Sequence, residues 1–223
     1  MQIGARESFA VHSRGTPTAR DYVQSGLVAM WDAIENAGWG EHDATSRTWV
    51  DLSGNNHDMS LTSSVTIGDD AMTFAASGQT GTFANILLSS VVSVEFVYKT
   101  NAVRVLYAVS FSSGGAQKYV AWRQNGKNLF FGNGMKNFLA EPTVRQSYHY
   151  DYSTTRLYVG GRELSSTSKG GSFQAKPAGI NTYGGGTYFM NGSFSSLRIY
   201  NRVLAAEEIA ANLAIDRERF NLP

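Results

Sequence analysis

The final segment of the chain, residues 193–220, predicts a strand, a sharp turn and a short helix in immediate succession. In its first eight residues, Leu197 and Ile199 share one face while the residues between them occupy the other, the period of a half-buried strand. Beyond the turn the period becomes helical, because Ile209 and Leu213 lie four residues apart with alanines beside them. A strand that leads directly into a short helix constrains the architecture more tightly than any other stretch of this sequence.

The rest of the chain has the pattern of short strands separated by turn residues. Its 223 residues include 23 glycines and 4 prolines, and only 17% are charged, which favours strands and turns over helices. Strand patterns recur about every 8 to 12 residues, as a β-sandwich requires. The clearest covers residues 91–99, and Asn125-Gly126 predicts a hairpin turn. The aromatic residues expected to pack are Trp31 and Trp49 in the core, and Tyr148, Tyr150 and Tyr152 in the core or at a subunit contact.

Charge, hydropathy and cysteine content exclude several classes of function. The formal net charge is +1 and the isoelectric point is near 7.9, which indicates no nucleic-acid partner. No run approaches the roughly 18 apolar residues of a membrane span, so membrane insertion is not expected. The chain has no cysteine, which excludes disulfides and thiolate metal sites. Residues 1–15 lack the apolar region of a secretory signal, and we expect this form of the chain to carry none.

Residues 1–25 differ in composition from the remainder. They are polar, contain Arg6, Arg14 and Arg20, and show no sustained periodicity. We predict an extended N-terminal arm over residues 1–25 and a single domain over residues 26–223. The arm is either flexible or ordered by docking on a neighbouring copy or partner.

Four segments resemble a known family in the order in which that family uses them. Residues 26–32 (GLVAMWD) and 49–57 (WVDLSGNNH) resemble the opening of laminin-G-like jelly rolls of the concanavalin A-like lectin/glucanase superfamily. Residues 156–164 (RLYVGGREL) resemble a hairpin of those domains, and residues 196–209 (SLRIYNRVLAAEEI) resemble their closing strand and helix. The resemblance implies an all-β fold, a two-sheet antiparallel jelly-roll β-sandwich with a short C-terminal helix.

The chain departs from the family pattern at two positions. Gly160 stands where the hairpin usually has a polar residue, and Ala205 stands where a Ser or Thr commonly caps the helix. An alanine at the cap costs about 1 kcal/mol of helix stability. A further resemblance, over residues 21–40, is to short laminin-G-like proteins of gut bacteria and their phages.

The carboxylate pattern argues against catalysis. Glycosidases of this superfamily carry a Glu-x-Asp-x-x-Glu or Glu-x-Asp-x-Glu run on one strand, so that an acid and a nucleophile face the same groove, and this sequence contains no such run. Here the adjacent pairs Asp69-Asp70 and Glu207-Glu208 would point in different directions on a strand, and no Ser/His/Asp constellation stands out. We therefore predict that the protein is not an enzyme.

A calcium site is one interpretation of the acidic and amide residues early in the chain. Related domains often hold Ca²⁺ at one rim through Asp and Asn oxygens. Asp51 and Asn55 are the candidate metal ligands, and the alternative is that they only stabilise a turn through hydrogen bonds to the backbone. The four histidines do not have the spacing of zinc ligands, so zinc is not expected. We expect that the protein requires no cofactor, and calcium is the one candidate ion. The neighbouring residues that could contribute are Asp32, Asp43, Asn56 and Asp58.

Sugar recognition needs an aromatic platform with polar groups at its edge. The aromatic candidates are Trp39, Trp122, Tyr183 and Tyr188, the last two beside Gly184-Gly185-Gly186. The candidate hydrogen-bonding residues are Asn125, Asn133 and Asn181, and Asn125 is grouped with the four aromatic residues as the predicted ligand-binding set. The alternative for each aromatic residue is packing at the rim, and the glycine run could be a loop that binds nothing.

Together these patterns predict a non-catalytic attachment protein that contacts a glycan or a protein surface. One setting is a phage virion component, such as a capsid decoration or fibre, with glycan or host-surface adhesion. There the N-terminal arm would contact virion subunits or other copies of the chain. The alternative is a carbohydrate-binding or adhesion module of a bacterial surface protein. The expected location is accordingly the virion, the cell surface or the extracellular space.

Overall fold

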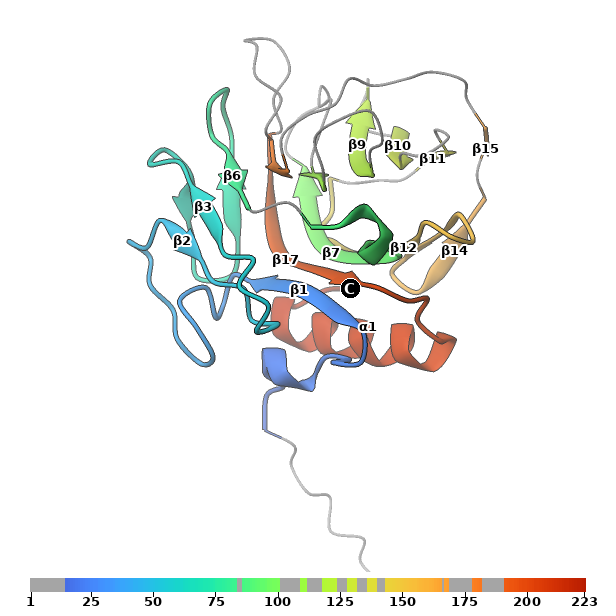
Figure 1. Ribbon diagram of the computed structural model, residues 1–223, viewed down its shortest axis with the longest axis horizontal. Helices are drawn as coiled ribbons and strands as arrows, with labels where there is room; N and C mark the ends of the chain where they lie inside the picture. Colours follow the sequence, from blue (N-terminus) through green and yellow to red (C-terminus); the bar gives the residue numbers. More distant parts are fainter. Residues whose placement is uncertain are drawn as a thin grey trace, which may run out of the picture.

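Two antiparallel sheets stack face to face, and one helix lies across the outer face of the first sheet (Figure 1). The computed structural model describes residues 15–83, 86–100, 109–111, 118–123, 128–131, 136–139, 143–165, 167–168, 178–181 and 191–223. The layered jelly-roll sandwich with a C-terminal helix that the sequence predicts is confirmed.

The first sheet is built around the last strand of the chain. Its order is β14-β13-β12-β7-β17-β5-β4, and β1 pairs with β17 beyond the end of β5. Strand β17 is buried at all nine positions, because the sandwich core covers one face and the helix covers the other. The strands of this sheet are β1 (Leu27–Asp32), β4 (Thr66–Ile67), β5 (Met72–Phe74), β7 (Ser93–Thr100), β12 (Gln146–Asp151), β13 (Arg156–Val159), β14 (Arg162–Leu164) and β17 (Gly192–Tyr200).

The second sheet closes the other side of the sandwich. Among the described residues its order is β15-β11-β10-β9-β8-β16-β6-β3-β2. Its strands are β2 (Thr48–Trp49), β3 (Met59–Leu61), β6 (Gly81–Thr82), β8 (Val109–Ser110), β9 (Tyr119–Arg123), β10 (Asn128–Phe131), β11 (Lys136–Leu139), β15 (Thr167–Ser168) and β16 (Gly179–Ile180). The Asn125-Gly126 turn predicted between β9 and β10 lies outside the described residues, but the two strands pair antiparallel as that hairpin requires.

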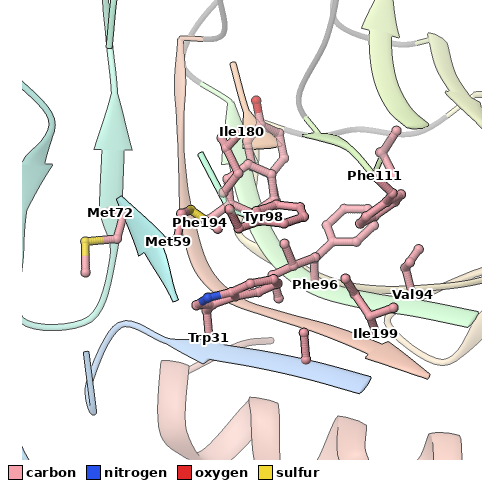
Figure 2. Close-up of a cluster of buried hydrophobic side chains, with 14 of the residues drawn as sticks. Trp31, Met59, Met72, Val94, Phe96, Tyr98, Phe111, Ile180, Phe194 and Ile199 are labelled. Carbon is pink, nitrogen blue, oxygen red and sulfur yellow. The ribbon is translucent and has the colours of Figure 1, made fainter. Parts of the chain in front are cut away.

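An aromatic core fills the space between the sheets. Figure 2 shows Trp31, Phe96 and Phe194 of the first sheet pointing into the same layer as residues of the second. The Phe96 ring stacks on Tyr148 with centroids 4.9 Å apart. Trp31, Trp49, Tyr148 and Tyr150 are buried there, so the prediction that they pack in the core is confirmed.

Helix α1 (Ala206–Phe220) begins directly after β17 and runs along the outer face of the first sheet (Figure 1). Ala205 at its N-cap makes no side-chain hydrogen bond, while its backbone N–H donates to Glu208 Oε2 at 2.8 Å. Glu208 also pairs with Arg202, and that pairing lowers the pKa of Glu208 to about 2. The helix ends at Asn221, whose left-handed φ of 50° lets its N–H bond the Arg217 carbonyl.

The segment before β1 is more integrated into the domain than the sequence predicts. Short 3₁₀ helices lie at Ala19–Asp21 and Leu88–Ser90, and the first of them sits against α1. Tyr22 is buried and donates to Asp216 of α1 at 2.8 Å, and the Val23 N–H donates to Asn212 at 2.9 Å. The apolar pattern of these few residues is too short to show periodicity, so their packing could not be recognised before the helix was placed. Residues 1–14 of the predicted arm lie outside the described residues.

Candidate functional site

The predicted calcium turn organises the backbone around Asp51. Each of its carboxylate oxygens accepts two hydrogen bonds, all at 2.9 Å. Oδ1 accepts from the N–H groups of Met30 and Ser53. Oδ2 accepts from the Ser53 hydroxyl and the His57 N–H. Asn55 donates to the Val28 carbonyl at 2.9 Å. Asp51 and Asn55 thus lie in the same turn, as expected, and tie it to strand β1.

The other residues of the proposed calcium set serve separate local structures. Asp58 accepts a hydrogen bond from the Asp51 N–H, Asp43 bonds Thr45, and Asp32 pairs with Arg219. In the part of the chain that the structure describes, no group of three or more His, Cys, Asp or Glu side chains comes together as a metal site would require. Calcium binding at this turn stays a prediction.

Trp39, the first aromatic residue of the predicted ligand-binding set, packs against a small apolar cluster beneath the 3₁₀ helix. The Arg20 guanidinium lies over its ring, 4.7 Å from the centroid. One face of the indole is therefore occupied by a cation of the same chain, and the ring is only partly exposed.

The remaining predicted ligand residues are far from Trp39 in the chain. Trp122 lies in β9 of the second sheet, paired with Leu129 of β10. Asn181 is buried and its amide donates to the Gln79 carbonyl at 2.6 Å, which gives it a structural contact. Asn125, Asn133, Tyr183 and Tyr188 lie outside the described residues. Their part in a binding site stays a prediction.

A layer of buried charges lies between the first sheet and α1, which sequence reasoning missed. Arg198 of β17 is completely buried and binds Asp216 of α1 through two nitrogens at 2.8 and 2.9 Å. Its Nε also donates to Glu95 of β7 at 3.1 Å, and its guanidinium lies 3.9 Å from the Tyr22 ring centroid. The layer joins four parts of the fold that are distant in sequence.

Glu95 is the centre of this layer on the sheet side. Its carboxylate accepts from Asn212 of α1 at 2.7 Å and contacts Nδ1 of His149 on β12 at 3.0 Å. Burial alone would raise the pKa of Glu95, but Arg198 and the hydrogen bonds from His149 and Asn212 hold it below its ordinary value. The group is therefore a buried carboxylate ion.

A groove opens at the edge of this layer, between the β12–β13 hairpin and the start of α1; we call it the seam groove. Its inner part has a volume of about 170 Å³, and its outer part, of about 440 Å³, continues over the β13–β14 turn. The hairpin wall of the inner part presents His149, Asp151, Thr154, Arg156 and Tyr158, and the opposite wall is apolar, formed by Val203, Leu204, Ala206 and Ile209.

Tyr158 lies where the two parts of the groove meet, because it lines both. Its ring is half-buried, and its hydroxyl forms a hydrogen bond with Arg156 that raises the pKa of that guanidinium. Asp151, in the hairpin wall of the inner part, is fixed in place because its carboxylate accepts hydrogen bonds from the hydroxyls of Ser153 and Thr154 at 2.8 and 2.6 Å. An aromatic ring, an apolar wall and a few fixed polar groups are the usual composition of a small-molecule site.

The sequence contained only an indirect signal for this groove. The hairpin of residues 156–164 was recognised as a family element, but its exposed face gave no reason to single out Tyr158. The missing information was that α1 lies alongside this hairpin, which the placement of the helix supplies.

The geometry defines a lectin-like jelly roll with a surface groove. The sequence profile of the concanavalin A-like lectin/glucanases superfamily matches residues 93–210, which is more than half of the chain. The protein belongs to that superfamily, and the predicted resemblance is confirmed. No curated protein matches this sequence. Within the described residues, no helix is both long enough and apolar enough to span a bilayer.

Solved structures share the fold at low sequence identity. Trypanosoma rangeli sialidase in complex with sialic acid is 13% identical with a TM-score of 0.61, over 92% of this chain and 34% of the sialidase chain. Domain 4 of the extracellular arabinanase AbnA of Geobacillus stearothermophilus, in complex with arabinotriose, is 16% identical with a TM-score of 0.58, over 84% of this chain and 98% of that domain. The binding domain of botulinum neurotoxin serotype D is 14% identical with a TM-score of 0.58, over 86% of this chain and 51% of that chain. This protein spans about a third of the length of the sialidase.

Proposed function

We propose that this protein is a non-catalytic attachment domain that binds glycans in the seam groove. The observation that carries the proposal is Tyr158, a half-buried aromatic ring between an apolar wall and a row of polar side chains. A sugar ring has an apolar C–H face and a polar edge, and such a groove offers a surface for each. Membership of a lectin/glucanase superfamily supports the choice of ligand, as does the arabinotriose complex of the arabinanase domain.

Glycan arrays followed by calorimetry test this proposal. We expect the full chain to bind at least one class of oligosaccharide, and Tyr158→Ala to weaken that binding about three- to tenfold, the loss of roughly 1 kcal/mol of ring stacking. A second pair of variants separates the groove from the rest of the surface. Val203→Asp lies in the groove and Val144→Asp lies outside the lining of the seam groove, and the two valines are 44% and 49% exposed. Equal effects of these two variants would contradict the assignment of the groove.

The proposal of a non-catalytic role is supported by the environment of two buried acids. Glu95 of β7 and Asp216 of α1 are both bound to Arg198, and both are buried. A general acid and a nucleophile need access to the scissile bond, and these two carboxylates have none. Incubation with the glycans that bind should therefore release no reducing ends, and a measurable release would refute the proposal.

For the biological setting we propose attachment within a phage virion, where residues 1–14 would contact neighbouring subunits. The support is the resemblance of residues 21–40 to short proteins of gut bacteria and phages. A bacterial surface module remains the alternative. Light scattering of the full chain and of a variant lacking residues 1–14 distinguishes them. Assembly that depends on those residues favours the virion, and a monomer in both cases favours the surface module.

A further inference from the structure

The hairpin wall of the seam groove carries an exposed cation. Arg156 of β13 lines the inner part, and 58% of its side chain is exposed. It shares one face of the strand with Tyr158, two residues further on, because side chains alternate along a strand. Tyr158 lines the groove together with Ile209 of α1, so this is the face that meets the helix. The Arg156 guanidinium is therefore accessible and lies on the groove side of the hairpin.

The acidic group of the inner part is already satisfied by its own hairpin. Asp151 is 2% exposed, and its carboxylate accepts hydrogen bonds from the backbone N–H and the hydroxyl of both Ser153 and Thr154. The Tyr158 hydroxyl accepts from Arg156, since a guanidinium can only donate, and this leaves the tyrosine proton for another acceptor. The accessible polar groups at this edge of the groove are therefore hydrogen-bond donors.

The ion pair that Arg156 makes is loose and exposed. Its Nε lies 3.7 Å from Oε1 of Glu163 on β14, which is longer than a hydrogen bond, and the Glu163 side chain is 50% exposed. An exposed pair of this kind contributes little to stability. A ligand with a negative charge could replace Glu163 as the partner of Arg156 at small cost.

A second arginine extends the positive charge along the groove. Arg217 of α1 lines the outer part, where its Nη2 donates to the Gly160 carbonyl at 3.4 Å and its Nε donates to the Pro223 carbonyl at 3.2 Å. In the part of the chain that the structure describes, no Asp or Glu lines the outer part. The whole chain has a formal net charge of only +1, so the exposed charge of this groove is more positive than the average surface.

We propose that the seam groove binds an acidic glycan, whose carboxylate or sulfate group pairs with Arg156 while the sugar ring that carries it lies against Tyr158. The inference rests on the proposed function and specifies its ligand. A guanidinium presents its N–H groups in a planar fork that matches two oxygens of such an anion. Arg217 would attract a further acidic unit in the outer part.

Two pairs of glycans, each with an acidic and a neutral member, test the ligand class by calorimetry. The carboxylate pair is trigalacturonic acid and its methyl ester, and the sulfate pair is sulfated lactose and lactose. We expect the acidic member of at least one pair to bind about tenfold more tightly than the neutral member. The pair that shows the difference identifies the anion. The difference should shrink as sodium chloride is raised from about 50 to about 500 mM, because salt screens exposed charges.

Two variants of the loose ion pair should act in opposite directions. Arg156→Gln should weaken binding of the acidic glycan about three- to tenfold and leave binding of the neutral glycan unchanged. Glu163→Gln should tighten binding of the acidic glycan about two- to threefold, because it removes the carboxylate that competes for Arg156. If the pair served only to hold the hairpin, both variants would change the affinity in the same direction.

An ion pair outside the lining of the groove supplies matched controls. Arg145 and Asp70 form a partly exposed pair with side chains 26% and 49% exposed. Arg145→Gln and Asp70→Asn change the net charge by the same amounts as the two groove variants, and neither should alter the affinity for the acidic glycan. Thermal unfolding of all four variants shows whether a loss of binding reflects a loss of folded protein.

The outcomes separate this inference from the proposed function. If the wild-type chain binds no glycan on the array or in calorimetry, the proposed function fails and the inference fails with it. If the chain binds glycans but prefers neither acidic member to its neutral counterpart, the inference alone is overturned. It is also overturned if Arg156→Gln binds the acidic glycan as tightly as the wild type, or if Arg145→Gln weakens that binding to the same extent.

Discussion

Arg198 and Asp216 face each other across the interface between β17 and α1, joined by two hydrogen bonds of 2.9 and 2.8 Å with no exposed surface on either side chain. Asp216 also accepts hydrogen bonds from Tyr22 and Ser147. The pair therefore connects the closing strand, the helix, the segment before β1 and strand β12. Because the hairpin wall of the seam groove continues from β12 and the other wall continues from α1, this pair holds the two walls together.

Breaking this pair is expected to be strongly destabilising. In Asp216→Asn, Arg198 keeps Glu95 but loses the carboxylate that it binds through two nitrogens, and a buried hydrogen bond to a charged group contributes about 1.5–3 kcal/mol. Urea unfolding followed by circular dichroism measures the change. Asp70→Asn provides the control, because it breaks the partly exposed pair with Arg145 and should cost less than about 1 kcal/mol. Similar losses in the two variants would show that the buried pair does not hold the helix.

Stability should fall as the solution is acidified, and Glu95 should contribute to that fall. Its pKa in the folded chain lies below the ordinary value of 4.5, so the unfolded chain takes up a proton first as the pH drops below that value. The stabilisation is complete above pH 4.5 and is lost as the pH falls toward the lower folded value. Asp32 changes the stability in the opposite direction. Burial raises its pKa from 3.8, so its protonation in acid favours the folded state.

The corresponding variant is Glu95→Gln, measured by urea unfolding between pH 7 and pH 3. We expect lower stability than the wild type at pH 7, since Arg198 and His149 lose a partner, and a shallower dependence on pH below 4.5. A variant with the same acid dependence as the wild type would refute the role given to Glu95. Glu208→Gln serves as a comparison, because the pKa of Glu208 is also low but its side chain is partly exposed.

The closing strand and helix were predictable because their periodicity is local. Leu197 and Ile199 mark the core face of β17, and Leu213 marks the inner face of α1. The charged layer was not predictable, because the alternation that places Leu197 in the core places Arg198 on a face that should meet water. Only the docking of α1 buries that face. Asn212 and Asp216, four residues apart on the helix, were the sequence signal for a polar inner stripe.

For the predicted site residues, too, local features could be predicted from the sequence and contacts between distant segments could not. Asp51 and Asn55 were correctly placed in one turn, since the Ser-Gly-Asn sequence that follows Leu52 is a local signal. Trp39 could not be assessed from its neighbours in the chain, because the cation that covers it, Arg20, lies in a segment predicted to be an extended arm. Tyr158 becomes a candidate only when α1 is placed beside β13, and that contact has no signal in either segment alone.

Adding a cap to α1 should stabilise the protein. Ala205 has the extended backbone of an N-cap, with φ −69° and ψ 158°, and lacks only the side-chain oxygen that would accept from the helix. Ala205→Ser is expected to raise the free energy of unfolding by about 1 kcal/mol. Ala210→Ser, on the exposed middle of the same helix, should instead lower it by about 0.5 kcal/mol. If the two serines act alike, the cap position has been wrongly assigned.

Removing the Asp51 carboxylate tests whether its turn needs an ion. Asp51→Asn replaces one acceptor oxygen with a donor that faces other N–H or O–H donors, so two of its four hydrogen bonds are lost. We expect a loss of about 1–3 kcal/mol in the free energy of unfolding. Because those four hydrogen bonds already engage both oxygens, the loss should be the same in EDTA and in millimolar calcium. A wild-type unfolding midpoint that rises with calcium, together with no rise in Asp51→Asn, would contradict this expectation and establish the turn as a calcium site.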